Sequence, residues 1–306
     1  MKIAVPDFIT NSYFPAVAAV ELGFFKEEGI DMTLEHIFPV NRACEVMRDG
    51  GIDFVAGAAH APLAAFKNWE GAKLLGALAQ GMYWMLVVRS DLDAERGDID
   101  AVKGLNIGAA PFVELGLRQM LTEAGIDIEA DGVKIAPVPG TGGDISFGVQ
   151  AARVLAEGKI DGFWANGMGA ETAIREGVGK LLVDIRRGDE PTKAFNYTQP
   201  ALMTTDALIE REPETAAAAV RALVKTQKTI VEDVRLTTKI GEKLFPGRDA
   251  SMIADVVARD LPYYDPEITP EFVVGMNEFM TDLGWLDSPV SYEKVVATQF
   301  SHLWKG

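Results

Sequence analysis

The sequence contains one α/β pattern twice, about a hundred residues apart. The first copy, Ile3–Ile30, reads as a short strand, the polar turn PDFITNS, an apolar helix and the close KEEGI. The second copy, Gly104–Asp127, again reads strand, turn, helix and E-x-G-I-D. Each copy is followed by a helix, a Gly-x-Ile-Asp step and an apolar strand, at Arg42–Ala59 and Ala151–Gly167. Such internal similarity predicts two alike α/β lobes, each opening with a turn suited to holding a ligand.

The order strand, helix, strand, helix, strand from Lys2 to Ala56 predicts a parallel-dominated sheet flanked by helices in each lobe. We expect lobe one at residues 1–90 and 198–306 and lobe two at 91–197. The aperiodic segments SDLDAERGDIDAVKG and RRGDEPTKAFNYT would carry the two crossings between them. From Asp206 onward the apolar spacing is helical, and we place these helices on the outside of lobe one.

Capping residues predict where the first helices begin. Thr10, Asn11 and Ser12 precede the apolar run that starts at Tyr13, and Pro15 falls in the first turn of that helix. Asn41 is the predicted cap of the next helix.

Composition excludes several classes of protein. A net charge of −16 argues against nucleic-acid binding, which requires a basic surface. Apolar runs fall short of the roughly 20 residues that span a bilayer, so we expect a soluble chain. The single cysteine, Cys44, excludes an internal disulfide and a multi-cysteine metal site, and a buried structural role is expected for it. MKIAVPDF runs directly into the first strand without a signal peptide, which predicts either a cytoplasmic protein or a mature periplasmic or cell-surface form.

Ligands of open parallel α/β sheets bind beyond the carboxyl ends of the strands, and this rule selects the candidate turns. In lobe one, the turn Asp7–Tyr13 offers the rings of two aromatic residues and three polar side chains: Phe8, Tyr13, Thr10, Asn11 and Ser12. An ordinary capping loop is the alternative. The turn Gly57–Pro62 offers Ala59 and His60, although a lone histidine is more often structural.

In lobe two, Ala109–Val113 is the equivalent turn, with Phe112 as a ligand wall. Pro139–Asp144 (PGTGGD) exposes the backbone N–H groups of Gly140, Gly142 and Gly143 and the Thr141 hydroxyl, and is suited to a carboxylate. A simple glycine turn is the alternative there. Asn166 is a further candidate, because it follows the strand of lobe two that matches the third strand of lobe one. The Tyr83–Trp84 pair, which precedes a strand, and Tyr197, at the return crossing, are candidates as well. Aromatic residues are more often core, which is the alternative for these.

None of these turns contains Lys or Arg, which weighs against a polyphosphate ligand. A small aromatic or heteroaromatic molecule, with a carboxylate as one option, fits better. No catalytic motif is present, and we expect neither a metal nor a cofactor.

The segment from Tyr13 through GFFKEEGIDMTLE, together with GGIDFVAGAAHAPLAAF, resembles the NMT1/THI5-like group of ABC-importer substrate-binding proteins for sulfonates, nitrate, taurine and thiamine precursors. The resemblance covers nearly the whole chain. It implies a two-lobed, type II periplasmic-binding-protein-like fold that closes on a small molecule, with ligand contacts at Asn11, Ser12, Tyr13, Ala59, His60, Phe112, Thr141 and Asn166. The missing signal peptide and the missing basic residue depart from that pattern. The Cys-rich motif of the fungal pyrimidine synthases in the group is absent as well.

Two functional hypotheses follow. The first is a non-catalytic, monomeric receptor whose partners are a small ligand and the membrane subunits of an ABC importer. The alternative is a cytoplasmic enzyme on the same fold, such as a decarboxylase, an isomerase or a pyrimidine-forming enzyme, with His60 as the acid–base group.

Overall fold

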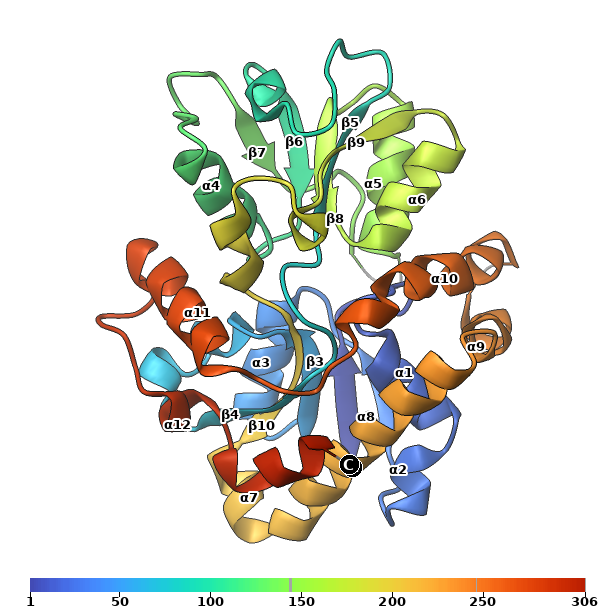
Figure 1. Cartoon of the computed structure of the whole chain (residues 1–306), viewed down its shortest axis with the longest axis vertical. Helices are drawn as coiled ribbons and strands as arrows, with labels where there is room; N and C mark the ends of the chain where they lie inside the picture. The colour runs from blue at the N-terminus through green and yellow to red at the C-terminus, as the bar shows by residue number, and fades with distance from the viewer. Residues whose placement is uncertain (143–144, 246, 306) are drawn as a thin grey trace. The chain divides into compact units, whose positions relative to one another are not determined.

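The chain forms two compact α/β units. The computed structural model describes residues 1–142, 145–245 and 247–305. The first unit comprises Met1–Gly81 and Asn196–Gly306, and the second comprises Met82–Phe195. Figure 1 shows the elements of both units with their labels.

The first unit is built on a five-stranded sheet in the order β2-β1-β3-β10-β4. The strand β1 pairs in parallel with β2 and β3, whereas β10 runs antiparallel between β3 and β4. The strand bounds are β1 Lys2–Val5, β2 Thr33–His36, β3 Phe54–Ala58, β4 Ala72–Ala77 and β10 Pro200–Thr205.

The second unit repeats this sheet in the order β7-β6-β8-β5-β9. Here β6 pairs in parallel with β7 and β8, and β5 is the antiparallel strand between β8 and β9. The bounds are β5 Met85–Arg89, β6 Asn106–Ala109, β7 Lys134–Ala136, β8 Gly162–Ala165 and β9 Gly179–Val183. The identical strand order confirms the predicted α/β class and the predicted repeat.

The position of β5 corrects one expected boundary. We expected lobe one to extend to residue 90, but β5 pairs with β8 and β9 of the second sheet. The first unit therefore ends at Gly81, ahead of the apolar run that precedes β5. A strand's membership depends on its hydrogen-bonding partners, and the local sequence does not reveal them.

Helices flank both sheets, and those after residue 205 all belong to the first unit. In the second unit, α5 and α6 lie side by side in contact (Figure 1). The first-unit helices are α1 Phe14–Glu21, α2 Phe24–Glu27, α3 Val40–Arg48, α7 Asp206–Arg211, α8 Pro213–Glu232, α9 Leu236–Leu244, α10 Gly247–Asp260, α11 Pro270–Asp282 and α12 Tyr292–Val295. The second-unit helices are α4 Glu114–Glu123, α5 Phe147–Ala156 and α6 Gly167–Arg175. Between β3 and β4 the chain forms two short 3-10 helices, Ala61–Ala64 and Lys67–Trp69.

Two predicted helix caps are wrong. Helix α1 begins after Tyr13 with Pro15 in its first turn, and no side chain caps it. Because Pro15 has no N–H to satisfy, one capping partner fewer is needed there. Helix α3 begins after Pro39, which places Asn41 inside the helix.

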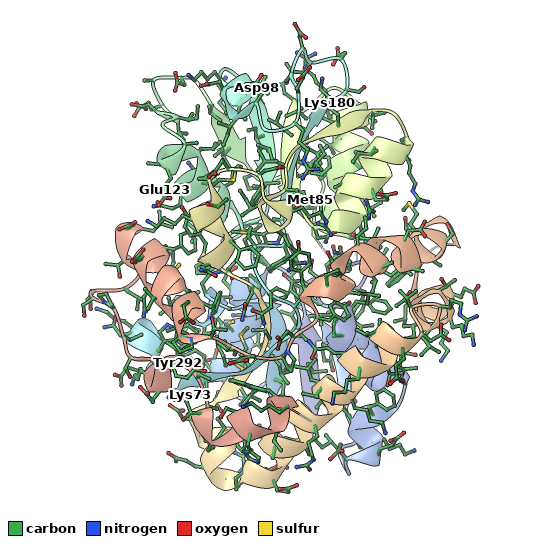
Figure 2. The ribbon with its side chains drawn as sticks, in the orientation of Figure 1. Lys73, Met85, Asp98, Glu123, Lys180 and Tyr292 are labelled. Carbon is green, nitrogen blue, oxygen red and sulfur yellow. The ribbon has the colours of Figure 1, made fainter. Side chains whose placement is uncertain are left out.

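Hydrogen bonds hold the C-terminal segment against β4. The Lys73 ammonium donates to the carbonyls of Glu293 and Lys294 at 2.5 and 2.8 Å. Figure 2 shows Lys73 and Tyr292 close together at this position. Ala297 N–H then donates to the Leu74 carbonyl, and the Trp304 indole donates to the Leu75 carbonyl. These bonds satisfy polar groups along β4 that an open sheet edge would expose.

Close packing of α5 on α6 depends on two glycines and generates a stability prediction. A Cβ added at Gly169 would lie 2.7 Å from the Gly148 Cα and 2.9 Å from its carbonyl oxygen. We expect Gly169→Ala to lower the free energy of unfolding by about 1–3 kcal/mol, because backbone must move to admit the methyl group. Chemical denaturation followed by circular dichroism measures this. Gly247→Ala is the matched control, since nothing lies within 4 Å of its added Cβ, and equal effects of the two substitutions would contradict the packing argument.

Candidate functional site

Three segments of the first unit meet at the carboxyl edge of its sheet. Residues 7–13 follow β1, and residues 59–60 follow β3. The antiparallel strand β10 begins at this same edge, because Pro200 pairs with Ala58. Ala59 N–H donates to the Gln199 carbonyl at 2.9 Å. The turn after β1, the turn after β3 and the segment before β10 are thereby grouped on one edge.

The turn after β1 contains buried polar atoms without partners. Asn11 is 2% exposed, and its Nδ2 donates to Asp260 Oδ2 at 2.5 Å. Among the described residues, neither Asn11 Oδ1 nor the buried hydroxyl of Ser12 has a hydrogen-bond partner. The Thr10 hydroxyl accepts the Ser12 N–H at 3.1 Å, which braces the turn. Tyr13 is buried where α1 begins.

Phe8 belongs to the same turn but lies against β2. Its ring centroid is 5.1 Å from that of His36. The His36 Nε2 in turn lies 3.0 Å from the Pro6 carbonyl oxygen. This contact gives Phe8 a structural role.

His60 is held in a layer of rings. It is fully buried, and its Nδ1 lies 2.9 Å from the Thr198 hydroxyl oxygen. The Phe279 ring meets His60 edge-on at 5.5 Å and stacks on Tyr197 at 4.7 Å and 10°. The predicted residues His60 and Tyr197 are thus brought together through Phe279 of α11.

Sequence reasoning missed Gln199, Asp260 and Phe279. Gln199 is 0% exposed, and neither its amide nitrogen nor its amide oxygen has a partner among the described residues. The only sequence signal was an amide residue next to an apolar strand in the return crossing. Asp260 and Phe279 lie about 250 and 220 residues from the turns they contact, and nothing local marks them.

The second unit gathers aromatic rings at the equivalent edge. Tyr83 and Trp84 precede β5, and their ring centroids are 4.6 Å apart. The Trp84 ring meets the Trp164 ring at 6.3 Å, because Met85 pairs with Ala165. Trp164 is fully buried, and its indole N–H has no partner among the described residues.

A buried cation at this edge corrects the expectation that basic residues are missing. Arg186 lies just after β9, is buried, and places its Cζ 5.9 Å from the Tyr83 ring centroid. That geometry is a cation–π contact. The sequence hid it because Arg186 stands in a charged stretch, RRGDE, that reads as solvated.

Phe112 and Glu114 form a strained and poorly satisfied turn after β6. Phe112 is buried with φ +71°, a conformation that is an outlier for a bulky residue and that recurs at ligand clamps. Glu114 opens α4, and its buried Oε2 has no partner among the described residues. Burial raises the pKa of the Glu114 carboxyl. The first turn of α4 packs on Trp84, since a Cβ at Gly116 would lie 3.4 Å from that ring.

Three other predicted contacts have local roles. The Thr141 hydroxyl donates to the Val138 carbonyl at 2.8 Å, and Gly142 has φ +131°. Asn166 Oδ1 caps α6 by accepting from Met168 and Gly169 N–H at 3.0 and 3.2 Å. Gly143 and Asp144 of the predicted anion turn lie outside the described residues.

Within the described ranges, no group of three or more His, Cys, Asp and Glu side chains is arranged to hold a metal ion. Nor does any described helix have the length and apolar character needed to cross a membrane.

Cys44 is predicted to be chemically inert in the folded protein. It is fully buried, its Sγ lies 4.0 Å from Met203 Sδ, and burial raises the pKa of its thiol. We expect no reaction with Ellman's reagent at pH 8 in buffer and one thiol per chain after unfolding in guanidinium chloride. Rapid labelling of the folded protein would contradict this burial.

Glu114 generates a pH prediction. A carboxyl whose pKa is raised by folding contributes stability below its unfolded-state pKa, and this contribution is lost as pH rises through the folded-state pKa. Glu114→Gln is therefore expected to increase the free energy of unfolding at pH 7 by at most about 1 kcal/mol, since the side chain is partly exposed. The gain should vanish at pH 3.5. Denaturation at both pH values tests it, and a loss of stability at pH 7 would refute it.

No curated protein matches the sequence. A solved protein from Bordetella bronchiseptica RB50 shares 21% identity with a TM-score of 0.78, covering 98% of this chain and 95% of the other. The periplasmic sulfonate-binding protein SsuA from Methylobacillus flagellatus KT shares 19% identity with a TM-score of 0.70, covering 100% and 93%. The desulfurization enzyme DSZB shares 16% identity with a TM-score of 0.67, covering 98% and 97%.

These likenesses show that the fold is the type II periplasmic-binding-protein-like fold. Residues 10–233 match the profile of the family described as NMT1/THI5 like. This span covers most of the chain, and the protein therefore belongs to the NMT1/THI5-like family.

Proposed function

We propose that the protein is a solute-binding receptor that delivers a small ligand with an aromatic body to an ABC importer. The observation that carries the proposal is a set of buried polar atoms on Asn11, Ser12 and Gln199, at one edge of the first sheet, that have no partner in the described part of the chain. Leaving a buried polar atom unpaired costs about 1–3 kcal/mol, so folded proteins retain few of them. A bound molecule at this edge supplies the missing partners.

Aromatic rings at the carboxyl edge of each sheet support a ligand with an aromatic body. His60, Tyr197 and Phe279 form one layer of rings in the first unit. Tyr83, Trp84 and Trp164 form a cluster in the second unit. Apolar walls with a few placed polar groups are typical of small-molecule sites.

The importer role rests on family membership and on the likeness to the periplasmic sulfonate-binding protein SsuA. A receptor of this kind works in the periplasm or at the cell surface, and we propose that location together with the importer's membrane subunits as partners. Closure of the two units on the ligand and a monomeric state remain predictions. Small-angle scattering with and without ligand tests both, and an unchanged radius of gyration would argue against closure.

The enzyme hypothesis has less support. His60 Nδ1 already lies at hydrogen-bond distance from Thr198, and Phe279 packs on its ring. The thiol of Cys44 is buried against Met203. Likeness to a desulfurization enzyme shows a shared fold, which does not decide the activity.

A ligand screen tests the receptor proposal. Thermal shift with small aromatic solutes, followed by calorimetry, should identify one that stabilises the fold by about 2.7 kcal/mol at 100 times its Kd. Gln199→Met should weaken that binding about tenfold or more, while the free energy of unfolding stays equal or rises because unpaired atoms are removed. Gln299→Met is the matched control, because Gln299 is exposed and lies in the C-terminal 3-10 helix.

Product analysis separates the receptor from an enzyme. The best ligand should be recovered unchanged after prolonged incubation with the protein. Conversion of that ligand, abolished by His60→Ala, would overturn the proposal in favour of the enzyme.

A further inference from the structure

We infer that the first unit has a second binding site, beside α8, for a small aromatic molecule that carries a hydrogen-bond donor. The site is a cavity of about 310 Å³. Cavities of roughly 300–1,000 Å³ are the usual size for small organic ligands. Its walls share no residue with the turns 7–13 and 57–62 or with the segment 197–200. The inference therefore goes beyond the proposed function and does not depend on it.

The cavity has three walls from distant parts of the chain. One wall is the face of α8 that carries Val224, Gln227 and Val231, which lie three and four residues apart and so share one side of the helix. The second wall is formed by residues 264–266, and the third by Trp304 of the C-terminal 3-10 helix. Only the packing of the first unit brings these segments together.

Hydrogen bonds to β4 hold two of these walls in place. The Pro266 carbonyl accepts the Ala77 N–H at 2.9 Å. The Trp304 indole donates to the Leu75 carbonyl, also at 2.9 Å. Because the walls are fixed before a ligand arrives, binding does not bear the cost of ordering them.

Gln227 holds the third wall and supplies a hydrogen-bond acceptor. It is 2% exposed, and its Nε2 donates to the carbonyls of Ala77 and Leu78 at 3.0 and 2.9 Å. The two hydrogens of this nitrogen have two acceptors, and a reversed amide would place its oxygen against both carbonyl oxygens. The amide orientation is thereby fixed. What remains is Oε1, a buried acceptor without a partner among the described residues.

The unpaired acceptor determines the polar group that the ligand needs. A buried acceptor gains most from a hydrogen-bond donor, so the ligand should carry an N–H or O–H group. The other walls suit an aromatic body, since Val231 is 52% exposed and the rings of Tyr264 and Trp304 line the same cavity.

The charged residues of the lining do not favour an ion of either sign. Lys228, Glu232 and Asp265 are all exposed and carry charges of both signs. A neutral ring with one donor, such as indole or phenol, therefore matches the cavity in size and in polar group.

Matched probes test the need for a donor in the wild-type chain. Indole is compared with indene, and phenol with toluene, because each pair keeps its shape while the second member lacks the donor. We expect indole and phenol to bind about tenfold more tightly than their partners in calorimetry. Equal affinities within both pairs, or no binding by any of the four probes, would overturn the inference.

Three variants test where the probe binds. Val231→Trp should weaken indole binding tenfold or more, because the larger ring fills the cavity. Val274→Trp is the matched control, since Val274 is 57% exposed on α11 and lies outside the cavity walls. Gln199→Met, at the candidate ligand edge, should leave indole binding unchanged. Full binding in a folded Val231→Trp variant, or loss of binding in Gln199→Met, would place the probe elsewhere and refute the second site.

A change at Gln227 tests the acceptor itself. Gln227→Met removes Oε1 and keeps a side chain of similar length, so the indole-to-indene affinity ratio should fall to about one. The loss of two hydrogen bonds to the end of β4 lowers stability as well, and circular dichroism checks that the variant is folded. The affinity ratio is insensitive to a general loss of stability. A folded variant that retains the wild-type ratio would exclude Gln227 as the acceptor, and the Val231→Trp comparison decides the site if the variant does not fold.

Discussion

The insertion of the antiparallel strand β10 between β3 and β4 is the constraint on which the first unit depends. It joins the C-terminal part of the unit to β3, which lies some 140 residues earlier in the chain. Its direction places Tyr197, Thr198 and Gln199 at the edge where β1 and β3 end. The same arrangement recurs with β5 in the second unit, which brings Tyr83 and Trp84 beside Trp164. In both units, the strand that follows a crossing completes the edge that carries the candidate site.

The candidate edge of each unit contains buried polar atoms that lack hydrogen-bond partners. Among the described residues, Asn11, Ser12 and Gln199 bury such atoms in the first unit, and Glu114 does the same in the second unit. Phe112 adopts a left-handed backbone conformation that most residues avoid. Along β4, by contrast, Lys73 and Trp304 both make hydrogen bonds to backbone carbonyls. Backbone strain and unpartnered polar groups gathered at one edge are features that recur at binding sites.

The candidate site was only partly accessible from sequence. The strand-end rule selected the turns that carry Asn11, Ser12 and His60, and the structure places those turns on one edge. The rule could not find Asp260, Phe279 or Gln199, because their contacts depend on where α10, α11 and β10 pack. It also assigned general ligand roles to Thr141 and Asn166, whose side chains form local turn and cap bonds. A polar residue in a turn serves either purpose, and only its bonding partners distinguish them.

The sequence by itself determined the α/β class, the repeat and the family. The reason is that hydrophobic periodicity and glycine-marked helix ends are local properties, which neighbouring residues in the sequence reveal. Predictions from the local sequence failed where a helix cap or the sheet membership of a strand depended on residues far away in the chain. The caps of α1 and α3 and the membership of β5 were decided by packing and strand pairing. Only the tertiary structure decided that Asn11 Nδ2 donates to Asp260, while Asn11 Oδ1 has no partner among the described residues. That bond joins residues far apart in the chain, so nothing in the linear pattern indicates it.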